Sequence, residues 1–551
     1  MVARPAVSKI VLLLFLGVIF FYSFNQLKES DSFYHLKTGQ VIWETWQVPH
    51  NDIFSLSAYD NRWVTHEWLG ELIFYGVYAS LGFFGLISFV ALAAALTYYL
   101  IYRLAFFRGA NVYIAPPFLF LFGYLTLELW IPRPQIFAFF SLAILLYILE
   151  VYSRERNRKL LPLAVATIWF WANVNASFIL GLLIFIFYFC AEGIKVLNPK
   201  FFGEPIDKES RIWLGVAATA AALVSLLNPN TYRIFTYSLE ILPTVRALGV
   251  LEWYPITSFL YETEAKVFFV QILAAAVLLG WWLGKRSETR NFALLAVVVG
   301  VSILPFISIR HVGFWPIVAA APLATAISGV FERYRSRFSG DNALLFIFIL
   351  GIVFLSGRLT KLPNKYFNEE TVPVYAADFI EKNHIQGPFF NTYDLGGYLI
   401  WRFWPEEKVF IDGRSEVFGP AAINEFFTIT GGLAGWDELV NKKYNFNYFI
   451  LSYRPEFIKE QLKPLMAAAK NNWPLVYWDD AAVVFVRNTP QNQSIIRTYG
   501  LYEISPFREP NSIPSDKRKE ALLEIQKLLS RSPATLVIQN YAQELMASRS
   551  F

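Results

Sequence analysis

The sequence Glu29-Ser30-Asp31-Ser32-Phe33-Tyr34-His35 opens a polar stretch that closes with Trp63-Val64-Thr65-His66-Glu67-Trp68. This stretch lies between an apolar run at residues 10–26 and another at residues 82–102. Three of the five histidines of the chain fall within it, among several acidic side chains. A loop that concentrates titratable groups beside a membrane is where we expect chemistry to occur.

The composition of the whole chain indicates a membrane protein. Of its 551 residues, 55% are hydrophobic and only 17% are charged, whereas soluble proteins are nearer a quarter charged. Mean hydropathy is +0.40, and the apolar residues gather in runs long enough for a helix to cross about 30 Å of hydrocarbon. We therefore predict a polytopic α-helical membrane protein with about 11 transmembrane helices. These are expected at residues 10–26, 82–102, 112–130, 134–152, 160–173, 176–194, 212–228, 266–284, 291–308, 313–330 and 341–358.

The orientation follows from the positions of lysine and arginine. Every second loop between the predicted spans is basic, and basic loops remain in the cytoplasm. This places the N-terminus in the cytoplasm of a protein integral to the cytoplasmic (inner) membrane. The loop at 27–81 and everything after residue 358 are then extracytoplasmic. The pairs 160–173/176–194 and 291–308/313–330 can alternatively be re-entrant hairpins, which leaves the sidedness unchanged.

Three simple sequence features narrow the class further. No small-residue cleavage site follows the first apolar run, which favours an uncleaved first span over a signal peptide. The single cysteine, Cys190, lies inside an apolar run and permits no intrachain disulfide. The net charge of +5 is explained by the basic loops, so we expect no nucleic-acid partner.

The chain divides into three expected parts: a transmembrane domain at 1–358, an extracytoplasmic α/β domain at 359–500 and a C-terminal helical hairpin at 501–551. In the α/β domain, helical patterns near 372–380 and 455–470 alternate with strand patterns. The strands are expected at 388–391, 408–412, 448–451 and 482–486. In the last part, helical patterns at 516–532 and 534–548 resemble a single tetratricopeptide repeat.

Two amphipathic helices are expected within the first outer loop, at 33–46 and 67–80, lying along the membrane surface. Asp31 begins the first one, where the helix N-terminus favours an ionised carboxylate. His35 follows one turn later on the same face. Such a carboxylate can act as a general base, or bind a divalent cation together with a substrate phosphate. Capping of the helix is the alternative role of Asp31.

The same loop resembles that of the GT-C fold membrane glycosyltransferases. The pattern is Asp31-Ser32-Phe33-Tyr34-His35, then Lys37-Thr38-Gly39, Val48-Pro49-His50-Asn51-Asp52 and Trp63-Val64-Thr65-His66-Glu67-Trp68. It is similar to the bacterial branch with dolichyl-phosphate-mannose-type mannosyltransferases and lipopolysaccharide-modifying enzymes, over about residues 10–330. The resemblance implies an acidic catalytic base or metal ligand after the first span, and a sugar donor carried on a polyprenyl phosphate. Many members have adjacent acidic residues here, whereas Ser30 separates Glu29 from Asp31. We favour Asp31 because it precedes the aromatic-histidine pattern.

A second resemblance lies in the α/β domain. Thr392-Tyr393-Asp394-Leu395-Gly396-Gly397-Tyr398-Leu399-Ile400-Trp401, followed by Ile411-Asp412-Gly413-Arg414, is similar to the acceptor-binding motif of the oligosaccharyltransferase catalytic subunit. Asp394 and Gly396 match that motif, and its paired tryptophans are absent. The resemblance implies that Asp394 and Tyr398 contact the acceptor. The alternative is a strand-turn-helix in which the glycines permit a tight turn and Asp394 caps it.

Charged residues at the outer ends of the spans are candidates for binding the donor. Arg133 lies between two prolines, and Arg310-His311 lies between two apolar runs. Charges at such depths are costly and are usually paired or functional, and guanidinium groups bind phosphate in a bidentate way. Snorkelling to anionic lipid headgroups is the alternative. Glu252 and Trp253 can line a substrate groove, although an interfacial aromatic anchor explains Trp253 equally well.

The function expected from these residues is transfer of a sugar from the lipid-linked donor to an extracytoplasmic glycan, lipid or protein, with inversion. Asp31 would accept the proton of the acceptor, while His35, His66 and Glu67 orient the acceptor or assist proton transfer. No cofactor is required, although Mg²⁺ or Mn²⁺ at Asp31 is compatible with the pattern. The competing classes are a lipid or sugar transporter or flippase, which would place ionisable groups mid-membrane, and a non-catalytic scaffold of envelope glycan assembly.

Overall fold

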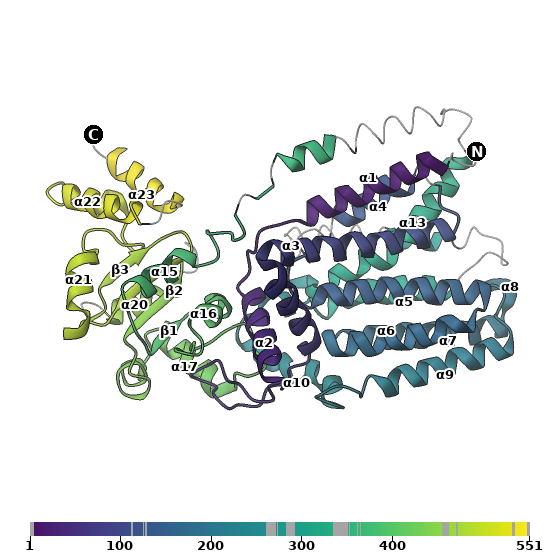
Figure 1. Cartoon of the computed structure of the whole chain (residues 1–551), viewed down its shortest axis with the longest axis horizontal. Helices are drawn as coiled ribbons and strands as arrows, with labels where there is room; N and C mark the ends of the chain where they lie inside the picture. Colours follow the sequence, from purple (N-terminus) through teal and green to yellow (C-terminus); the bar gives the residue numbers. More distant parts are fainter. Residues whose placement is uncertain are drawn as a thin grey trace. The chain divides into compact units, whose positions relative to one another are not determined.

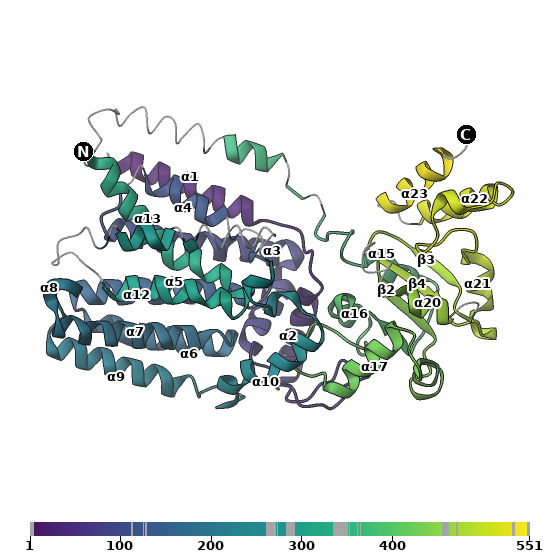
Figure 2. The same cartoon turned by 180° about the vertical axis from the view of Figure 1, so that it is seen from behind.

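The computed structural model of the chain separates into two compact units, each assembled from two segments of sequence (Figures 1 and 2). The first unit contains residues 1–25 and 64–364, and the second contains residues 26–63 and 365–551. The structure describes residues 5–111, 114–124, 126, 129–259, 271–272, 274–280, 282, 292–333, 351, 353–360, 362–363, 365–453, 462–469, 472–531 and 535–547. The polar stretch after the first helix therefore belongs mostly to the second unit.

The first unit is a bundle of helices. In chain order they are α1 (Pro5–Ser23), α3 (Trp68–Phe107), α4 (Ala115–Tyr124), α5 (Gln135–Glu155), α6 (Leu161–Val174), α7 (Phe178–Leu197), α8 (Pro199–Phe202), α9 (Lys208–Val224), α10 (Arg233–Ala247), α12 (Phe292–Ile303) and α13 (Phe314–Arg333). Helix α3 packs against α1 and α5, and α6 packs against α5 and α9. Short 3₁₀ turns, η3 (Leu251–Trp253) and η7 (Ile309–Gly313), lie between the longer helices.

The helices of the first unit match most of the predicted spans. Four segments of the described chain are long and apolar enough to cross a membrane: α3, α5, α7 and Ile309–Val330. Three shorter apolar helices, Lys9–Ser23, Ala115–Tyr124 and Phe292–Phe306, fall at further predicted spans. The prediction at 160–173 corresponds to α6, and that at 212–228 is displaced to α9. Because 266–284 and 341–358 lie largely outside the described residues, the number eleven stays a prediction.

The junction between the first outer loop and the second span is marked by a glycine. Helix α3 is interrupted at Gly82, whose φ of 64° and ψ of −164° are not helical. A positive φ is easily adopted only by glycine. This break confirms the boundary between the helix predicted at 67–80 and the span predicted at 82–102.

Two glutamates inside the first unit are buried and paired. Glu150 contacts the Arg108 guanidinium and accepts a hydrogen bond of 2.7 Å from Tyr188 Oη. Glu192 Oε1 lies 2.6 Å from Lys195 Nζ. Buried charges are expected to be paired in this way, because an isolated charge in an apolar interior is costly.

The second unit has a four-stranded sheet surrounded by helices (Figure 1). The strands are β1 (Phe389–Asn391), β2 (Tyr448–Ser452), β3 (Leu475–Trp478) and β4 (Ala482–Val486), in the order β1-β2-β4-β3. β1 and β2 are parallel, and the other two pairs are antiparallel. The helices are α2 (Asp31–Thr45), α15 (Val374–Lys382), α16 (Gly396–Phe403), α17 (Pro420–Thr430), α18 (Trp436–Glu438), α20 (Lys463–Ala469), α21 (Gln493–Tyr499), α22 (Arg518–Leu529) and α23 (Leu536–Ala547). Every strand residue is buried, as unbroken apolar strand patterns predict.

The strand predictions are confirmed at three positions and wrong at one. β1, β2 and β4 fall where expected, and β3 is an additional short strand after Pro474. Residues 408–412 do not join the sheet. Instead, Val409 forms an isolated bridge with Ser55, and Leu56 N donates to Val409 O at 2.7 Å. The apolar segment 408–412 therefore pairs with residues 55–56 of the loop at 27–81.

The helical predictions of this region are largely confirmed. Helix α15 lies where residues 372–380 predicted it, and α22 and α23 lie within 516–532 and 534–548. The helix predicted at 455–470 is described only from residue 462 onward, and the Ser-Pro break at 532–533 lies outside the described residues.

Helix α2 has surroundings that differ from those predicted. The helix itself is confirmed, but Phe33 and Leu36, assigned to the membrane surface, have 0% exposed area inside the second unit. They are buried because α2 packs against α16; the ring of Phe33 lies 4.8 Å from that of Tyr398. Only the end of the helix, with Trp43 and Trp46, exposes large apolar side chains.

Candidate active site

Two glycines of the segment 396–414 lie against the start of α2 within the second unit, and a third glycine packs against another part of the same segment. A Cβ added to Gly413 would lie 2.1 Å from Asp31 Oδ1, and one added to Gly397 would lie 2.3 Å from Ser30 O. A Cβ on Gly396 would lie 2.2 Å from Ile411 O. Real Cβ atoms do not approach other atoms so closely, so a Cβ at any of these positions would force its neighbour to shift.

This arrangement replaces the tight turn that we predicted for the two adjacent glycines. Gly396 has a φ of −54°, and both glycines belong to α16, so close approach and not a special backbone conformation accounts for them. Asp394 does not cap the turn. Its Oδ2 atom accepts a hydrogen bond of 2.6 Å from Ser452 Oγ at the end of β2.

The N-terminus of α2 is held by a backbone contact from α16. Ser30 occupies the N-cap position without a side-chain capping hydrogen bond, and Asp31 is the first helical residue. Ser30 Oγ accepts a hydrogen bond of 2.7 Å from Tyr398 N. The Tyr398 hydroxyl accepts one of 2.9 Å from Arg402 Nη1. Tyr398 therefore positions the start of α2.

A buried ion cluster joins the first outer loop to the Gly413 segment. Arg414 Nη1 lies 2.6 Å from Asp52 Oδ1, and its Nε and Nη2 atoms lie 2.8 and 2.7 Å from the two oxygens of Asp412. All three side chains are at most 1% exposed. The rings of Phe54 and Trp63 flank the guanidinium at 4.9 and 4.6 Å.

Two aspartates beside Arg414 keep its guanidinium positively charged in spite of burial. Burial by itself would lower the pKa of Arg414, but Asp412 and Asp52 more than reverse this effect and raise it. The bidentate contact with Asp412 also fixes the geometry of the segment. Because Gly413 lies between Asp412 and Arg414, the cluster determines where the Asp31 carboxylate meets the backbone. Sequence reasoning quoted these residues only as parts of motifs and did not predict their pairing.

The four predicted catalytic residues fall in different compact units. Asp31 and His35 belong to the second unit, where His35 is 2% exposed and its ring lies 4.2 Å from that of Tyr34. His66 and Glu67 belong to the first unit. There, His66 Nε2 lies 3.7 Å from Glu67 Oε1, and the His66 ring lies 4.0 Å from that of Tyr237.

Asparagines at the ends of the spans hold the His66-Glu67 segment. Asn175 Nδ2 donates to Glu67 Oε1 at 2.7 Å, and Trp68 Nε1 donates to Asn173 Oδ1 at 2.9 Å. Asn230 Nδ2 donates to Thr65 O at 3.1 Å. Sequence reasoning gave no signal of these partners.

Two arginines of the first unit converge on one carboxylate. Glu252 lies 3.6 Å from Arg133 and 3.8 Å from Arg310, and all three side chains are partly exposed. The Arg310 guanidinium lies 4.5 Å from the ring centre of Trp253, within cation–π range. Burial raises the pKa of Glu252, but the charges of Arg310 and Arg133 outweigh it, and the pKa is lowered. Glu252 is therefore ionised at neutral pH.

The loop before α13 is fixed to the Glu252 segment by backbone contacts. Ser308 Oγ donates to Glu252 O at 2.7 Å, and Ile309 N donates to Tyr254 O at 2.9 Å. His311 Nδ1 lies 3.1 Å from Ser308 O. The predicted donor-binding residues Arg133 and Arg310 thus form one cluster with the predicted groove residues Glu252 and Trp253, and His311 lies beside it. A partly exposed pair of guanidinium groups can bind an anionic headgroup.

Few of the described side chains are placed to ligate a metal ion. Within the described ranges, no group of three or more His, Cys, Asp and Glu side chains could hold a metal ion. Asp52 and Asp412 are both engaged by Arg414. The residues therefore fit only a cation whose remaining ligands come from a bound substrate, as is usual for Mg²⁺ at phosphate sites.

Comparison with solved structures identifies the fold. The Archaeoglobus fulgidus oligosaccharyltransferase tethered to an acceptor peptide containing an NVT sequon matches with a TM-score of 0.54 and 13% identity, over 88% of this chain and 74% of that chain. The chain has a GT-C fold. AglB of the same organism, in complex with an inhibitory peptide and a dolichol-phosphate, matches with a TM-score of 0.52 and 13% identity, over 88% and 75% of the two chains. No protein-family model and no curated protein matches the sequence. The apolar helices and the membrane-enzyme fold together indicate a membrane protein.

Proposed function

We propose that this protein is a membrane glycosyltransferase that moves a sugar from a polyprenyl-phosphate donor to an extracytoplasmic glycan, lipid or protein. The observation that carries the proposal is the placement of the Asp31 carboxylate against Gly413, at the N-terminus of α2. The GT-C fold supports it, as does the dolichol-phosphate in the matching AglB complex.

Asp31 is proposed as the general base. The acceptor hydroxyl attacks the anomeric carbon of the donor, the bond from that carbon to the phosphate oxygen breaks, and Asp31 takes the hydroxyl proton. A single displacement of this kind inverts the anomeric centre. The helix N-terminus stabilises the ionised carboxylate before the reaction, and Gly413 leaves the space that the carboxylate occupies. His35, His66 and Glu67 remain proposed to orient the acceptor, and Asp394 and Tyr398 to support its binding.

Arg310 is proposed to bind the phosphate of the donor, with Arg133 as the second contact. The Glu252 carboxylate lies 3.8 Å from Arg310 Nη1 and 3.6 Å from Arg133 Nη1. Both distances are longer than those of a close ion pair. Guanidinium has five N–H donors, and among the described residues Arg310 has Glu252 and the ring of Trp253 as partners. The singly charged phosphodiester of the donor can thus replace or supplement the carboxylate, and the lipid phosphate released on transfer gains further negative charge. The leaving lipid phosphate would be stabilised by the same contacts.

A divalent cation is compatible with this scheme. Asp31 would hold it together with oxygens of the donor phosphate, where it would neutralise charge on the leaving group. The other steps depend only on the side chains of this chain. Removal of metal with EDTA, followed by titration of Mn²⁺ or Mg²⁺, measures whether transfer requires it.

The test is transfer in proteoliposomes from a panel of polyprenyl-phosphate sugars, with Asp31→Asn compared with wild type at equal protein levels. We expect the amide to abolish transfer, because it cannot accept the proton. Glu29→Gln is the matched control and should retain transfer. Unchanged transfer by Asp31→Asn would remove Asp31 from its role, and loss in Glu29→Gln alone would assign the base to Glu29. If wild type transfers no sugar from any donor, the scaffold or transporter class replaces the proposal.

A further inference from the structure

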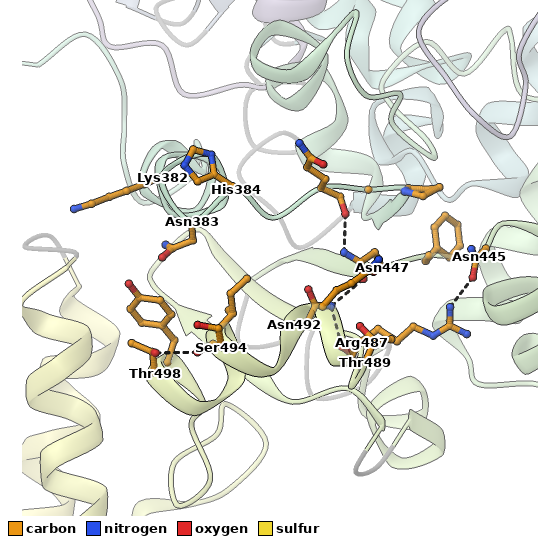
Figure 3. A pocket seen from close by; sticks show the side chains of 17 residues that line it. Lys382, Asn383, His384, Asn445, Asn447, Arg487, Thr489, Asn492, Ser494 and Thr498 are labelled. Atoms are coloured by element: carbon orange, nitrogen blue, oxygen red, sulfur yellow. Dashed lines mark hydrogen bonds between the residues drawn. The ribbon is translucent and has the colours of Figure 1, made fainter.

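A polar pocket lies at one edge of the sheet in the second unit, beside the start of β1 (Figure 3). Its volume is about 910 Å³, at the upper end of the range of ligand sites. It is lined by residues after α15, by the loop before β2 and by the segment from Arg487 into α21. The Asp394-Gly397 motif follows the other end of β1, so this pocket is separate from the motif that holds Asp31.

The lining is unusual because amide and hydroxyl side chains dominate it. Ligand pockets are ordinarily lined mostly by apolar groups with a few polar ones. The amides here are Asn383, Gln386, Asn445, Asn447, Gln491 and Asn492, and the hydroxyls are Thr489, Ser494, Thr498 and Tyr499. Amides and hydroxyls both donate and accept hydrogen bonds. Such a surface matches a ligand with many hydroxyl groups and gives little to an apolar one.

Several of these amides are already fixed in position by one another. Asn447 Nδ2 donates to Gln386 O at 2.6 Å, and Asn447 Oδ1 accepts from Asn492 Nδ2 at 2.8 Å. Asn492 Nδ2 also contacts Arg487 O at 2.9 Å. Figure 3 shows these contacts as a chain along the pocket. Side chains that are held before binding lose less entropy when a ligand arrives.

The charge of the pocket is positive. Lys382, His384 and Arg487 line it, and none of its lining residues is acidic. Figure 3 shows Lys382 and His384 toward one side and Arg487 toward the other. Glu407 lies behind the lining residue Gly387, and its two oxygens accept hydrogen bonds from Gly387 N at 2.8 Å and Tyr448 Oη at 2.7 Å. Burial raises the pKa of Glu407, against the opposing effect of these two hydrogen bonds.

Arg487 is held by neutral groups. Its Nη1 atom donates to Asn445 Oδ1 at 2.6 Å and its Nη2 atom donates to Asn441; within the described part of the chain no carboxylate pairs with it. Two of its five N–H groups are thereby used and three remain for a ligand. Its orientation is fixed while its charge is not neutralised, as expected of a site for an anion.

One hydroxyl in the pocket lacks a partner. Thr489 Oγ1 is buried, and no hydrogen-bond partner for it lies among the described residues. Burying a hydroxyl without a partner destabilises the folded protein. Two lining residues, His384 and Asn445, also have left-handed backbone conformations, with φ of 52° and 50°. Strained backbone and unsatisfied polar groups concentrate at binding sites.

We propose that this pocket binds an acidic oligosaccharide, one that carries a carboxylate or phosphate group. The amides and hydroxyls would contact the sugar hydroxyls, and Arg487 with Lys382 would contact the anionic group. Binding itself is independent of sugar transfer. Its use as the site that captures a glycan acceptor rests on the proposed function.

The test is calorimetric titration of the full-length protein in detergent with three probes: trigalacturonate, a maltotriose phosphate and neutral maltotriose. We expect at least one acidic trisaccharide to bind about tenfold more tightly than maltotriose, with an affinity that falls as salt rises. Equal binding of the neutral and acidic sugars, or no binding of any, would overturn the proposal. Inorganic phosphate is titrated separately, and if it binds as tightly as the acidic sugars the pocket is a simple anion site and the glycan assignment fails.

Two variants test whether the acidic sugar binds in this pocket. Arg487→Gln should weaken the acidic sugar about tenfold, the usual effect of losing a charged hydrogen bond. Thr489→Val should weaken it about threefold without lowering thermal stability, since Thr489 Oγ1 has no partner among the described residues. The matched control is Arg497→Gln, an exposed residue of α21 outside the lining. Binding unchanged in both pocket variants would place the sugar elsewhere. Because no sugar is transferred in this assay, its outcome is independent of that of the Asp31→Asn experiment.

Discussion

Gly413 has no space for a side chain because the Asp31 carboxylate occupies it: an added Cβ would lie 2.1 Å from Asp31 Oδ1. These residues are far apart in sequence but belong to one compact unit. The contact is reinforced on both sides, by Ser30 against Gly397 and by the buried cluster of Arg414 with two aspartates. The proposed base thus lies against a segment that is itself held by these contacts.

Gly413→Ala tests this positioning directly. The added methyl group must displace either the carboxylate or the backbone, and a displacement of about 1 Å in an active site can cost roughly 10²-fold in rate. We therefore expect transfer activity to fall by about that factor, with kcat more affected than KM, in the proteoliposome assay. Gly419→Ala is the matched control, since a Cβ there meets nothing within 4 Å. Equal activity of the two variants would show that the contact does not position the base.

Arg414→Met tests whether the buried cluster stabilises the second unit. Removing the guanidinium leaves Asp52 and Asp412 buried without their shared partner, and breaking such a pair costs about 3–5 kcal/mol. We expect the free energy of unfolding of this unit to fall by that amount, measured by hydrogen exchange of the strand amides in the full-length protein. The control is Lys442→Met, which removes an exposed pair with Glu438 at 3.9 Å and should cost under about 1 kcal/mol. A loss no larger than that of the control would mean that the cluster contributes little.

Arg310→Gln tests the proposed phosphate contact in the first unit. Loss of a guanidinium that binds the donor phosphate should raise the KM for the donor about tenfold or more, while the KM for the acceptor stays unchanged. Arg133→Gln should have a smaller effect of the same kind. Arg246→Gln, an exposed position on α10, serves as the control for a change of net charge. A rise in acceptor KM instead would assign Arg310 to acceptor binding.

The sequence predicted the helices of the membrane region well because long apolar runs and charged loop ends are local signals. It also named Asp31, Arg310 and Glu252 as site residues, which stay predictions, but it did not predict that Glu252 lies 3.8 Å from Arg310. It did not predict that α2 is buried within the second unit, since Phe33 and Leu36 fit an interfacial helix and a protein core equally. Nor did it predict the role of Gly413, because a glycine required by close approach looks the same in sequence as one required by a turn. Such information is carried by long-range contacts and not by periodicity.

Asp479 provides a test of the pH dependence of the second unit. It is buried in the turn between β3 and β4, where it accepts hydrogen bonds from Tyr477 Oη and from the backbone N–H groups of Ala481 and Ala482. Burial, only partly offset by these hydrogen bonds, raises its pKa from 3.8 to about 6. The folded state therefore favours the protonated form, so the contribution of this group is fully present below pH 4 and is lost as pH rises through 6. The difference corresponds to roughly 3 kcal/mol.

Asp479→Asn should remove this dependence, because the uncharged amide oxygen can accept from Ala481 N and Ala482 N while its NH2 group donates to the Tyr477 hydroxyl. We expect the variant to become more stable than wild type as pH rises from 4 to 7, by up to roughly 3 kcal/mol at pH 7, in hydrogen-exchange measurements at fixed ionic strength. Asp437→Asn, at an exposed position of α18, should shift stability by less than about 0.5 kcal/mol. If the difference between Asp479→Asn and wild type stays constant across this pH range, Asp479 does not titrate there, and its turn hydrogen bonds stabilise the ionised form as well as water does.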